Sequence, residues 1–282
     1  MWFWLAVLAG IASAGHHLVD RHIMKDGKDP IAFAFLFQLI QIILILPVLP
    51  FDFKATLEIV PVLLLFLTGM VEILTIIIFA NMHKYVEVSI SSIIMRLRTV
   101  WVVLLAYLFL GERLTINGII GAILVLAGLS LVSLRKFNKK ALFSSKALIF
   151  PFLFSLTTAM ETTLMKNAAN NFSAVCVFIV VILPSVIILP MISRGIIKKA
   201  SKFLKENGSW VFLTSFLGTI SFYTFQQSLH FGDVSRIMPI YQSFSVLVIF
   251  GGIFLLKERG RIWQKILGGV LAAIGVVLVK GS

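Results

Sequence analysis

The chain has 282 residues, of which 59% are apolar and only 13% charged, and its mean hydropathy is +1.03. A soluble domain carries about a quarter of its residues as charged side chains, so this composition excludes an ordinary water-soluble enzyme. The net charge of +13 would fit nucleic-acid binding, but the 25 Lys and Arg residues lie in short gaps between apolar runs. Basic residues in such gaps are typical of loops that flank a membrane. We therefore expect no nucleic-acid partner.

Ten apolar runs follow one another along the chain. A helix needs about 20 apolar residues to cross the hydrocarbon core of a bilayer, and runs of this length alternate with short polar or charged segments. The sequence therefore predicts an all-α integral membrane protein with ten transmembrane helices. Their expected spans lie near 3–22, 31–49, 60–81, 88–110, 115–134, 147–166, 172–192, 210–229, 235–256 and 262–280.

The first span and the single cysteine each raise a separate question. Ala12-Ser13-Ala14 is similar to the cleavage site of a signal peptide, but residues 1–10 contain no Lys or Arg, so we expect a retained helix. Cys176 lies inside an apolar run and has no second cysteine to pair with. An intramolecular disulfide and a cysteine-based metal cluster are therefore excluded.

The distribution of basic residues predicts the orientation of the chain in the membrane. Loops rich in Lys and Arg face the cytoplasm. Of the 25 basic residues, 18 lie in the loops after the odd-numbered spans and 5 in the loops after the even-numbered spans and the C-terminal tail. This bias places both termini outside. The segment 194–205 has apolar residues at helical spacing opposite its lysines, which predicts either a short helix on the inner membrane surface or a solvated basic loop.

The chain also contains an internal repeat. Residues 88–113 align with residues 234–259 at a constant offset of 146, and the last spans of each half match at an offset of 147. We expect two repeats of five spans each, 1–137 and 145–282. Because five is an odd number, the second repeat enters the membrane from the opposite side. Inverted repeats around a central cavity are the architecture of secondary transporters.

The residues that match between the halves also resemble a known family. They include the Gly-Asp-Val-Ser segment at 232–235, Pro239, the Glu-Arg pairs that end spans 4 and 9, and the glycines of spans 5 and 10. Together they are similar to the EamA domain of the drug/metabolite transporter superfamily over essentially the whole chain. The resemblance implies a ten-helix transporter for a small metabolite or drug, with a cavity lined chiefly by spans 1, 3, 4, 6, 8 and 9. It also implies cytoplasmic termini, opposite to the charge bias.

Three charged residues lie near the middle of the predicted spans, away from the span ends: Glu72, Arg96 and Arg98. Such groups persist in a bilayer mainly where they pair or line a pathway. Glu72 and Arg96 each lie 12 residues from Lys84 at the predicted hairpin tip, so they should share one depth. We expect an ion pair between them that faces the cavity, where Arg96 would also hold a substrate carboxylate or phosphate. The alternative is a pair that only joins two helices. Arg98 lies about 200° round the helix from Arg96, so both cannot enter one small cavity.

A second group of ionisable residues is a candidate for proton coupling. His16 and Asp20 are four residues apart and share a helix face, and Asp20 aligns with Glu161 in the second repeat. A histidine and a carboxylate can take up and release a proton. The alternative is that these are ordinary charges near helix ends. Adjacent His16 and His17 are a weak metal signal, and we expect no metal.

Uncharged polar residues complete the predicted binding site. Tyr223 and Gln226 lie in span 8, and Tyr241 and Gln242 lie in span 9 near Pro239. Side chains of this kind suit hydrogen bonding to a polar solute within an apolar wall. The alternative is hydrogen bonding between helices.

Small residues form a stripe on each of two spans. Such stripes allow close helix packing, either within the bundle or between the protomers of a homodimer. The stripes consist of Gly121 and Gly128 in span 5, and of Gly268, Ala272 and Gly275 in span 10.

These features predict a secondary transporter of a small organic metabolite or drug, amphipathic or anionic, that works by alternating access in the plasma membrane. No phosphate-binding Gly-x-x-x-x-Gly-Lys-Ser/Thr motif occurs, and we expect no cofactor and no enzymatic activity. The lipid bilayer and a small-molecule substrate are the expected partners. The alternatives are a lipid-carrier flippase subunit and a membrane-embedded enzyme acting on lipid, which would need a nucleophile and a base at recognisable spacing.

Overall fold

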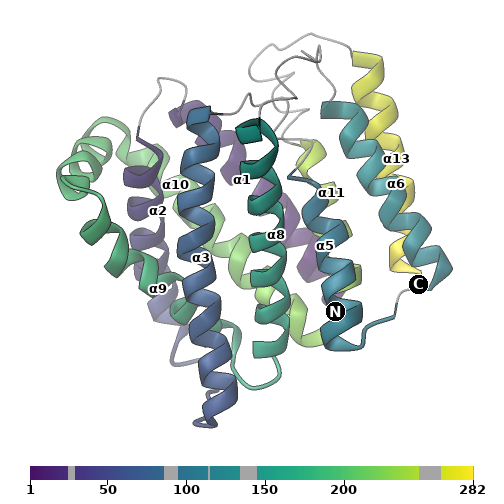
Figure 1. Cartoon of the computed structure of the whole chain (residues 1–282), viewed down its shortest axis with the longest axis horizontal. Helices are drawn as coiled ribbons and strands as arrows, with labels where there is room; N and C mark the ends of the chain where they lie inside the picture. The colour runs from purple at the N-terminus through teal and green to yellow at the C-terminus, as the bar shows by residue number, and fades with distance from the viewer. Residues whose placement is uncertain (25–28, 86–94, 114, 134–144, 248–261, 282) are drawn as a thin grey trace.

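The computed structural model describes residues 1–24, 29–85, 95–113, 115–133, 145–247 and 262–281 (Figure 1). Within these ranges the chain is all-helical, as the sequence predicts. The described residues form the α-helices α1 (Trp2–Ile23), α2 (Pro30–Ile45), α3 (Ile59–Tyr85), α5 (Leu97–Leu105), α6 (Ile116–Ser133), α8 (Ser145–Ala168), α9 (Ala174–Ile192), α10 (Ile196–Phe231), α11 (Val234–Ser243) and α13 (Ile262–Lys280), together with a 3-10 turn, η2 (Leu46–Val48), and a π-helical turn, η3 (Ala106–Leu110).

Several of these helices have the length and apolar character of membrane spans. Among the described residues, four segments qualify by both criteria: Trp2–Asp20, Pro30–Val48, Ile59–Met82 and Ala174–Ile192. Large apolar side chains on the outside of the bundle remain exposed, such as Phe109 at 74%. An exposed apolar surface of this extent suits contact with lipid rather than water. The chain is therefore a membrane protein.

The basic segment before span 8 is helical. It forms the first part of α10, which bends at Asn207, where φ is −136°. Ala200 and Phe203 are buried against α1 and α2, whereas Ile197 is exposed. Lys199 Nζ lies 2.7 Å from Asp29 Oδ2, so an ion pair attaches this helix to the start of α2. Of the two alternatives for this segment, the helix is confirmed.

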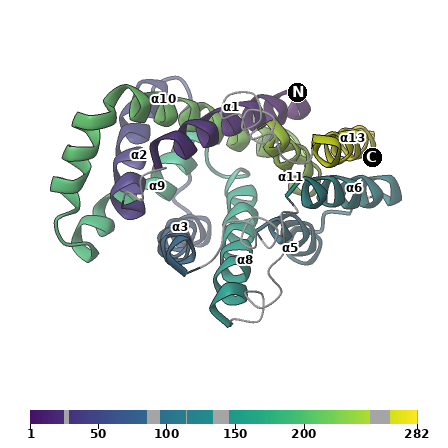
Figure 2. The ribbon, with the colours of Figure 1, turned by 90° about the horizontal axis from the view of Figure 1, so that it is seen from above.

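The arrangement of the long helices follows from their small and hydroxylated residues. α8 packs between α3 and α5, while α1 packs along α10 (Figures 1 and 2). Threonines on α8 are buried because their hydroxyls donate to carbonyls of the preceding turn, as Thr162 does to Thr158 at 2.7 Å. Such internal bonds satisfy a hydroxyl without a partner on another helix. The buried threonines of α8 therefore leave no hydroxyl unpaired where the helix packs between α3 and α5.

α6 and α13 form a close pair at one edge of the molecule (Figure 2). A Cβ atom on Gly128 would lie 2.4 Å from the Gly268 carbonyl oxygen, and one on Gly121 would lie 2.6 Å from that of Gly275. The two backbones are therefore in direct contact at both crossings. The small-residue stripes pack within the bundle, which is one of the two alternatives that the sequence allows.

Replacing Gly128 by Ala should destabilise the protein, because its new methyl group meets backbone atoms of α13 that cannot move aside alone. We expect Gly128→Ala to lower the free energy of unfolding by about 1–3 kcal/mol, measured as thermal unfolding in detergent. Gly208→Ala is the matched control, since its Cβ would lie 4.0 Å from the nearest atom, Leu204 Cδ1. Equal stability of the two variants would contradict the backbone contact.

Asp29 should give a measurable pH dependence at the start of α2. Partial burial raises its pKa, but the Lys199 side chain and the N–H groups of Ala32 and Ile31 outweigh this and hold the pKa below its usual range. A lowered pKa contributes stability that is complete above the unfolded value of about 4 and is lost as the pH falls through the folded value. Asp29→Ala should therefore cost about 1 kcal/mol at neutral pH, and the cost should shrink as the pH falls below the unfolded value of about 4 and through the folded value.

The variant Asp29→Asn separates the two contributions of this side chain, because Asn keeps the capping oxygen and loses the charge. Its thermal stability should lie between those of the wild type and Asp29→Ala at neutral pH. A pH-independent difference between the wild type and Asp29→Ala would show that the charge contributes nothing.

Candidate functional site

A cavity of about 170 Å³ lies where helices of the two halves of the chain meet. This volume is small beside the roughly 300–1,000 Å³ of sites for drug-sized ligands, so it suits a small solute. Aromatic side chains form part of the wall, with the rings of Phe79 and Phe154 at a centroid distance of 5.4 Å. The complete lining comprises Ser13, Ala14 and His17 from α1, Phe79 from α3, Met95 and Arg98 at the start of α5, Phe154 from α8, and Tyr241, Gln242 and Ser245 in and after α11.

Arg98 is the cationic group of this cavity. Its Nη2 donates to Gln242 Oε1 at 2.5 Å, and the guanidinium carbon lies 6.0 Å from the centre of the Tyr241 ring. Its Nε is buried and has no hydrogen-bond partner in the part of the chain that the structure describes. A buried N–H group without a partner costs about 1–3 kcal/mol. An anionic solute in the cavity would remove this cost.

The predicted ion pair between Glu72 and Arg96 is not formed. Arg96 immediately precedes α5, is 8% exposed, and its Nη1 lies 3.3 Å from Ser245 Oγ. Glu72 instead accepts a hydrogen bond of 2.7 Å from Gln38 on α2. The reason is that α8 separates α3 from α5 (Figure 2). Equal depth along two helices does not bring side chains together when a third helix lies between them.

The ionisable residue near Glu72 is Glu161 on α8, and not Arg96 as the sequence predicts. It is 9% exposed and lies near Glu72 on α3, which packs against α8. Arg98 lies within electrostatic range of Glu161. Glu161 therefore connects the carboxyl group on α3 to the arginine of the cavity. Ser185 on α9 extends the connection by donating to Gln38.

His16, His17 and Asp20 form a separate group on α1. His16 Nδ1 lies 3.1 Å and His17 Nδ1 3.7 Å from Asp20 Oδ2, and Thr214 on α10 donates to Asp20 Oδ1 at 2.5 Å. The His17 side chain is 55% exposed and faces the cavity. The ligand atoms of this group lie within 4.8 Å of one another, close enough to hold a metal ion. Hydrogen bonds with His16 and Thr214 already satisfy Asp20, and the absence of a metal stays a prediction.

Tyr223 and Gln226 lie outside the cavity. Gln226 is completely buried and donates to the Met165 carbonyl at 3.3 Å. The Tyr223 hydroxyl lies 3.3 Å from Asp52 Oδ2, and the same carboxylate accepts a 3.0 Å bond from Gln227. Gln226 therefore makes a contact between helices, which was the alternative to substrate binding, whereas Tyr223 contacts the loop that follows η2. α10 contributes no residue to the lining of the cavity.

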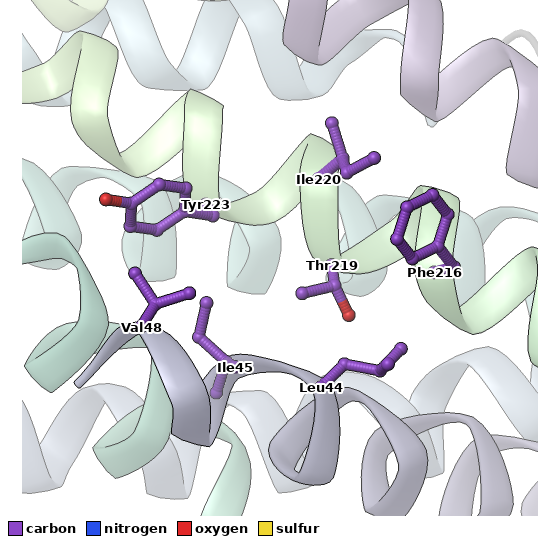
Figure 3. A pocket seen from close by; sticks show the side chains of 7 residues that line it. All are labelled: Leu44, Ile45, Val48, Phe216, Thr219, Ile220 and Tyr223. Carbon is purple, nitrogen blue, oxygen red and sulfur yellow. The ribbon is translucent and has the colours of Figure 1, made fainter. Parts of the chain in front are cut away.

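Tyr223 borders a different hollow, between α2 and α10 (Figure 3). Its ring lies beside Ile45 and Val48, and Phe216 closes the other end. The lining is almost entirely apolar. This hollow therefore lacks the groups that would orient a polar solute.

Tyr241 and Gln242 reach the cavity because α11 is anchored at its first turn. Glu112, which follows η3, accepts hydrogen bonds from the backbone N–H groups of Val234 at 3.0 Å and Ser235 at 2.9 Å, and from the Ser235 hydroxyl at 2.6 Å. A carboxylate at a helix N-terminus is favoured by the helix dipole. The Tyr241 hydroxyl then donates to Ser13 Oγ at 2.9 Å, which joins α11 to α1 across the cavity.

The sequence identified part of this lining and missed the rest. Tyr241 and Gln242 were predicted to line the cavity. The sequence also showed that Arg96 and Arg98 point in different directions from their helix, but helical spacing alone cannot decide which of them faces the cavity. Ser13, Phe79 and Phe154 gave no signal, because serines and phenylalanines are common throughout these spans. The segments 86–94 and 248–261, which include parts of predicted spans 4 and 9, lie outside the described residues.

Comparison with known proteins identifies the family. One solved crystal structure superposes with a TM-score of 0.76 at 13% sequence identity, covering 98% of this chain and 95% of the other; at this identity the likeness shows the fold alone. No curated protein sequence matches the chain. The model of the EamA-like transporter family matches residues 1–134 and again residues 145–281. The chain therefore belongs to the EamA-like transporter family.

Proposed function

We propose that this protein is a secondary transporter of a small organic anion, working by alternating access in the plasma membrane. The observation that carries the proposal is Arg98, a cation with an unpaired Nε in a small cavity of a chain from a transporter family. An arginine presents several N–H donors in a fixed plane and matches a carboxylate or phosphate. The apolar wall of Phe79 and Phe154 suits a short hydrocarbon portion of the same solute.

The proposal includes ten membrane spans arranged as two inverted repeats. Helix pairings support the inversion, because each contact between two helices has a matching contact between their counterparts in the other half. α1 packs on α10 as α8 packs on α3, and α11 packs on α1 as α5 packs on α8. The glycine contacts between α6 and α13 follow the same symmetry. Gly121 matches Gly268 and Gly128 matches Gly275, so the contact of Gly128 with Gly268 corresponds to that of Gly275 with Gly121. Such symmetry lets two halves rock about one site.

Orientation follows from the basic residues. Both termini lie on the same side of the molecule (Figure 1), and the basic helix 196–206 lies at the other end of the bundle. The charge bias then places this helix in the cytoplasm and both termini outside. Cysteine labelling of the termini in intact cells with a membrane-impermeant reagent distinguishes this from the opposite orientation.

Transport and enzymatic action on lipid predict different arrangements of polar groups. An enzyme would need a nucleophile beside a base at one membrane interface. The polar groups of this cavity are an arginine, a histidine, a tyrosine, a glutamine and two serines, and the Tyr241 and Ser13 hydroxyls bond to each other. This set is better suited to holding a solute than to cleaving one.

Arg98→Gln should weaken anion binding, since it removes the cation of the cavity. We would screen purified protein by thermal shift against lactate, succinate and ethanesulfonate, with uncharged lactamide as the control solute, and then measure counterflow of each hit in liposomes. A charge-assisted hydrogen bond contributes about 1.5–3 kcal/mol, so affinity should fall about 10- to 100-fold in Arg98→Gln. Arg113→Gln, at an exposed arginine, should behave as the wild type.

Two outcomes would contradict the proposal. Binding without counterflow would exclude transport of that solute, and equal stabilisation by lactate and lactamide would exclude recognition of an anion. Arg96→Gln tests the sequence-based assignment, because a larger loss there than in Arg98→Gln would make Arg96 the binding group.

A further inference from the structure

The cavity has a polar wall and an apolar wall, and equivalent positions of the two repeats contribute to opposite walls. Ser13 on α1 corresponds to Phe154 on α8 at an offset of 141, and Tyr241 on α11 corresponds to Met95 before α5 at an offset of 146. All four side chains line the cavity. In each pair one residue carries a hydroxyl group and its counterpart is apolar. A solute in this cavity therefore needs both a polar part and an apolar part.

Several acceptors of the cavity are already in use. The side-chain oxygens of Ser13, Gln242 and Ser245 each accept a hydrogen bond, at 2.9, 2.5 and 3.3 Å respectively. Their donors are Tyr241 and the two arginines at the start of α5. An arginine side chain has donors only. A hydroxyl group on a bound solute would therefore need a further acceptor for its hydrogen, and His17 is placed to provide it.

The acceptor atom of His17 follows from its position beside Asp20. His17 Nδ1 lies 3.7 Å from Asp20 Oδ2. An ionised carboxylate can only accept, so a neutral imidazole carries its proton on Nδ1, facing this oxygen, and Nε2 keeps its lone pair. The two ring nitrogens point to nearly opposite sides of the ring. Since the side chain is 55% exposed and lines the cavity, Nε2 is directed into the cavity.

The neutral form of His17 is consistent with its neighbours. Asp20 already forms hydrogen bonds with His16 and Thr214, and Arg98 contributes a permanent positive charge to the same cavity. A second positive charge on His17 would be repelled by that of Arg98. The cavity thus combines a cation with a neutral acceptor.

We propose that the substrate is a short 2-hydroxycarboxylate, whose hydroxyl group donates to His17 Nε2 while Arg98 holds its carboxylate. The hydrocarbon end of this solute then meets the apolar wall at Phe154. The inference rests on the proposed function, and it names the substrate class among the small organic anions. In such a solute the hydroxyl group lies on the carbon next to the carboxylate, so both groups fit into a cavity of about 170 Å³.

An ammonium group at the same carbon would also donate to His17. It would place a second positive charge in the cavity that already holds Arg98, and like charges at short range are unfavourable. A hydroxyl group donates its hydrogen without adding charge. The arrangement therefore favours the hydroxyl group over the ammonium group.

Three solutes that differ at a single position test this inference. Lactate, propionate and alanine carry a hydroxyl group, a hydrogen atom and an ammonium group at the same carbon, and their binding to the purified whole protein is measured by isothermal titration calorimetry. Lactate should bind about 2- to 10-fold more tightly than propionate, which is the size of one neutral hydrogen bond, and more tightly than alanine.

The failure of this inference can be distinguished from that of the proposed function. Equal binding of lactate and propionate, or tighter binding of alanine than of lactate, would overturn the hydroxycarboxylate and leave the anion site intact. Absence of binding by every anion tested would overturn the proposed function itself. The wild-type comparison decides the inference even if a variant fails to fold.

Two substitutions assign the preference to His17. His17→Phe keeps a ring and removes the acceptor, so the preference for lactate over propionate should disappear. His17→Gln retains an acceptor oxygen and should keep part of the preference. His22→Phe is the matched control, since His22 lies five residues further along α1 with its ring centroid 5.1 Å from that of Trp210, and it should keep the wild-type preference. A preference for lactate that survives in His17→Phe would overturn the role of His17.

Discussion

The position of α8 between α3 and α5 determines which charged groups meet inside this protein. A membrane interior offers no water to compensate a buried charge, so each ionisable side chain depends on the neighbours that packing provides. α8 can lie in the middle because its buried hydroxyls bond to its own backbone. It carries one acidic residue within its buried face, Glu161, on the helix that packs against both α3 and α5.

Much of the fold could be predicted from the sequence because helix signals are local. The start of α2 shows this, since Asp29 followed by Pro30 is a strong N-terminal signal and the structure places the cap there. The amphipathic segment before Asn207 could be recognised as a candidate helix from the spacing of its apolar residues. The internal match of the two halves predicted two repeats, and the family model matches the chain twice, over residues 1–134 and 145–281.

The candidate site was predictable only in part, because contacts between distant helices are not local. The depth of Glu72 and Arg96 could be calculated from helix rise, but the helix that separates them could not. Likewise, Tyr223 has the same chemistry as Tyr241, yet Asp52 from a distant loop holds the first and Ser13 holds the second. Residue type and depth therefore restrict the possible partners of a buried polar group without selecting one.

The glycine contact between α6 and α13 has a mechanical consequence. α6 belongs to the first half of the chain and α13 to the second, and no side chain separates their backbones at either crossing. The pair lies at one edge of the molecule, and α2, α9 and the basic helix 196–206 lie at the opposite edge (Figures 1 and 2). If one half turns against the other, this contact acts as the fulcrum. Displacement then grows with distance from it, so the edge formed by α2 and α9 travels farthest while the α6 and α13 axes keep their spacing.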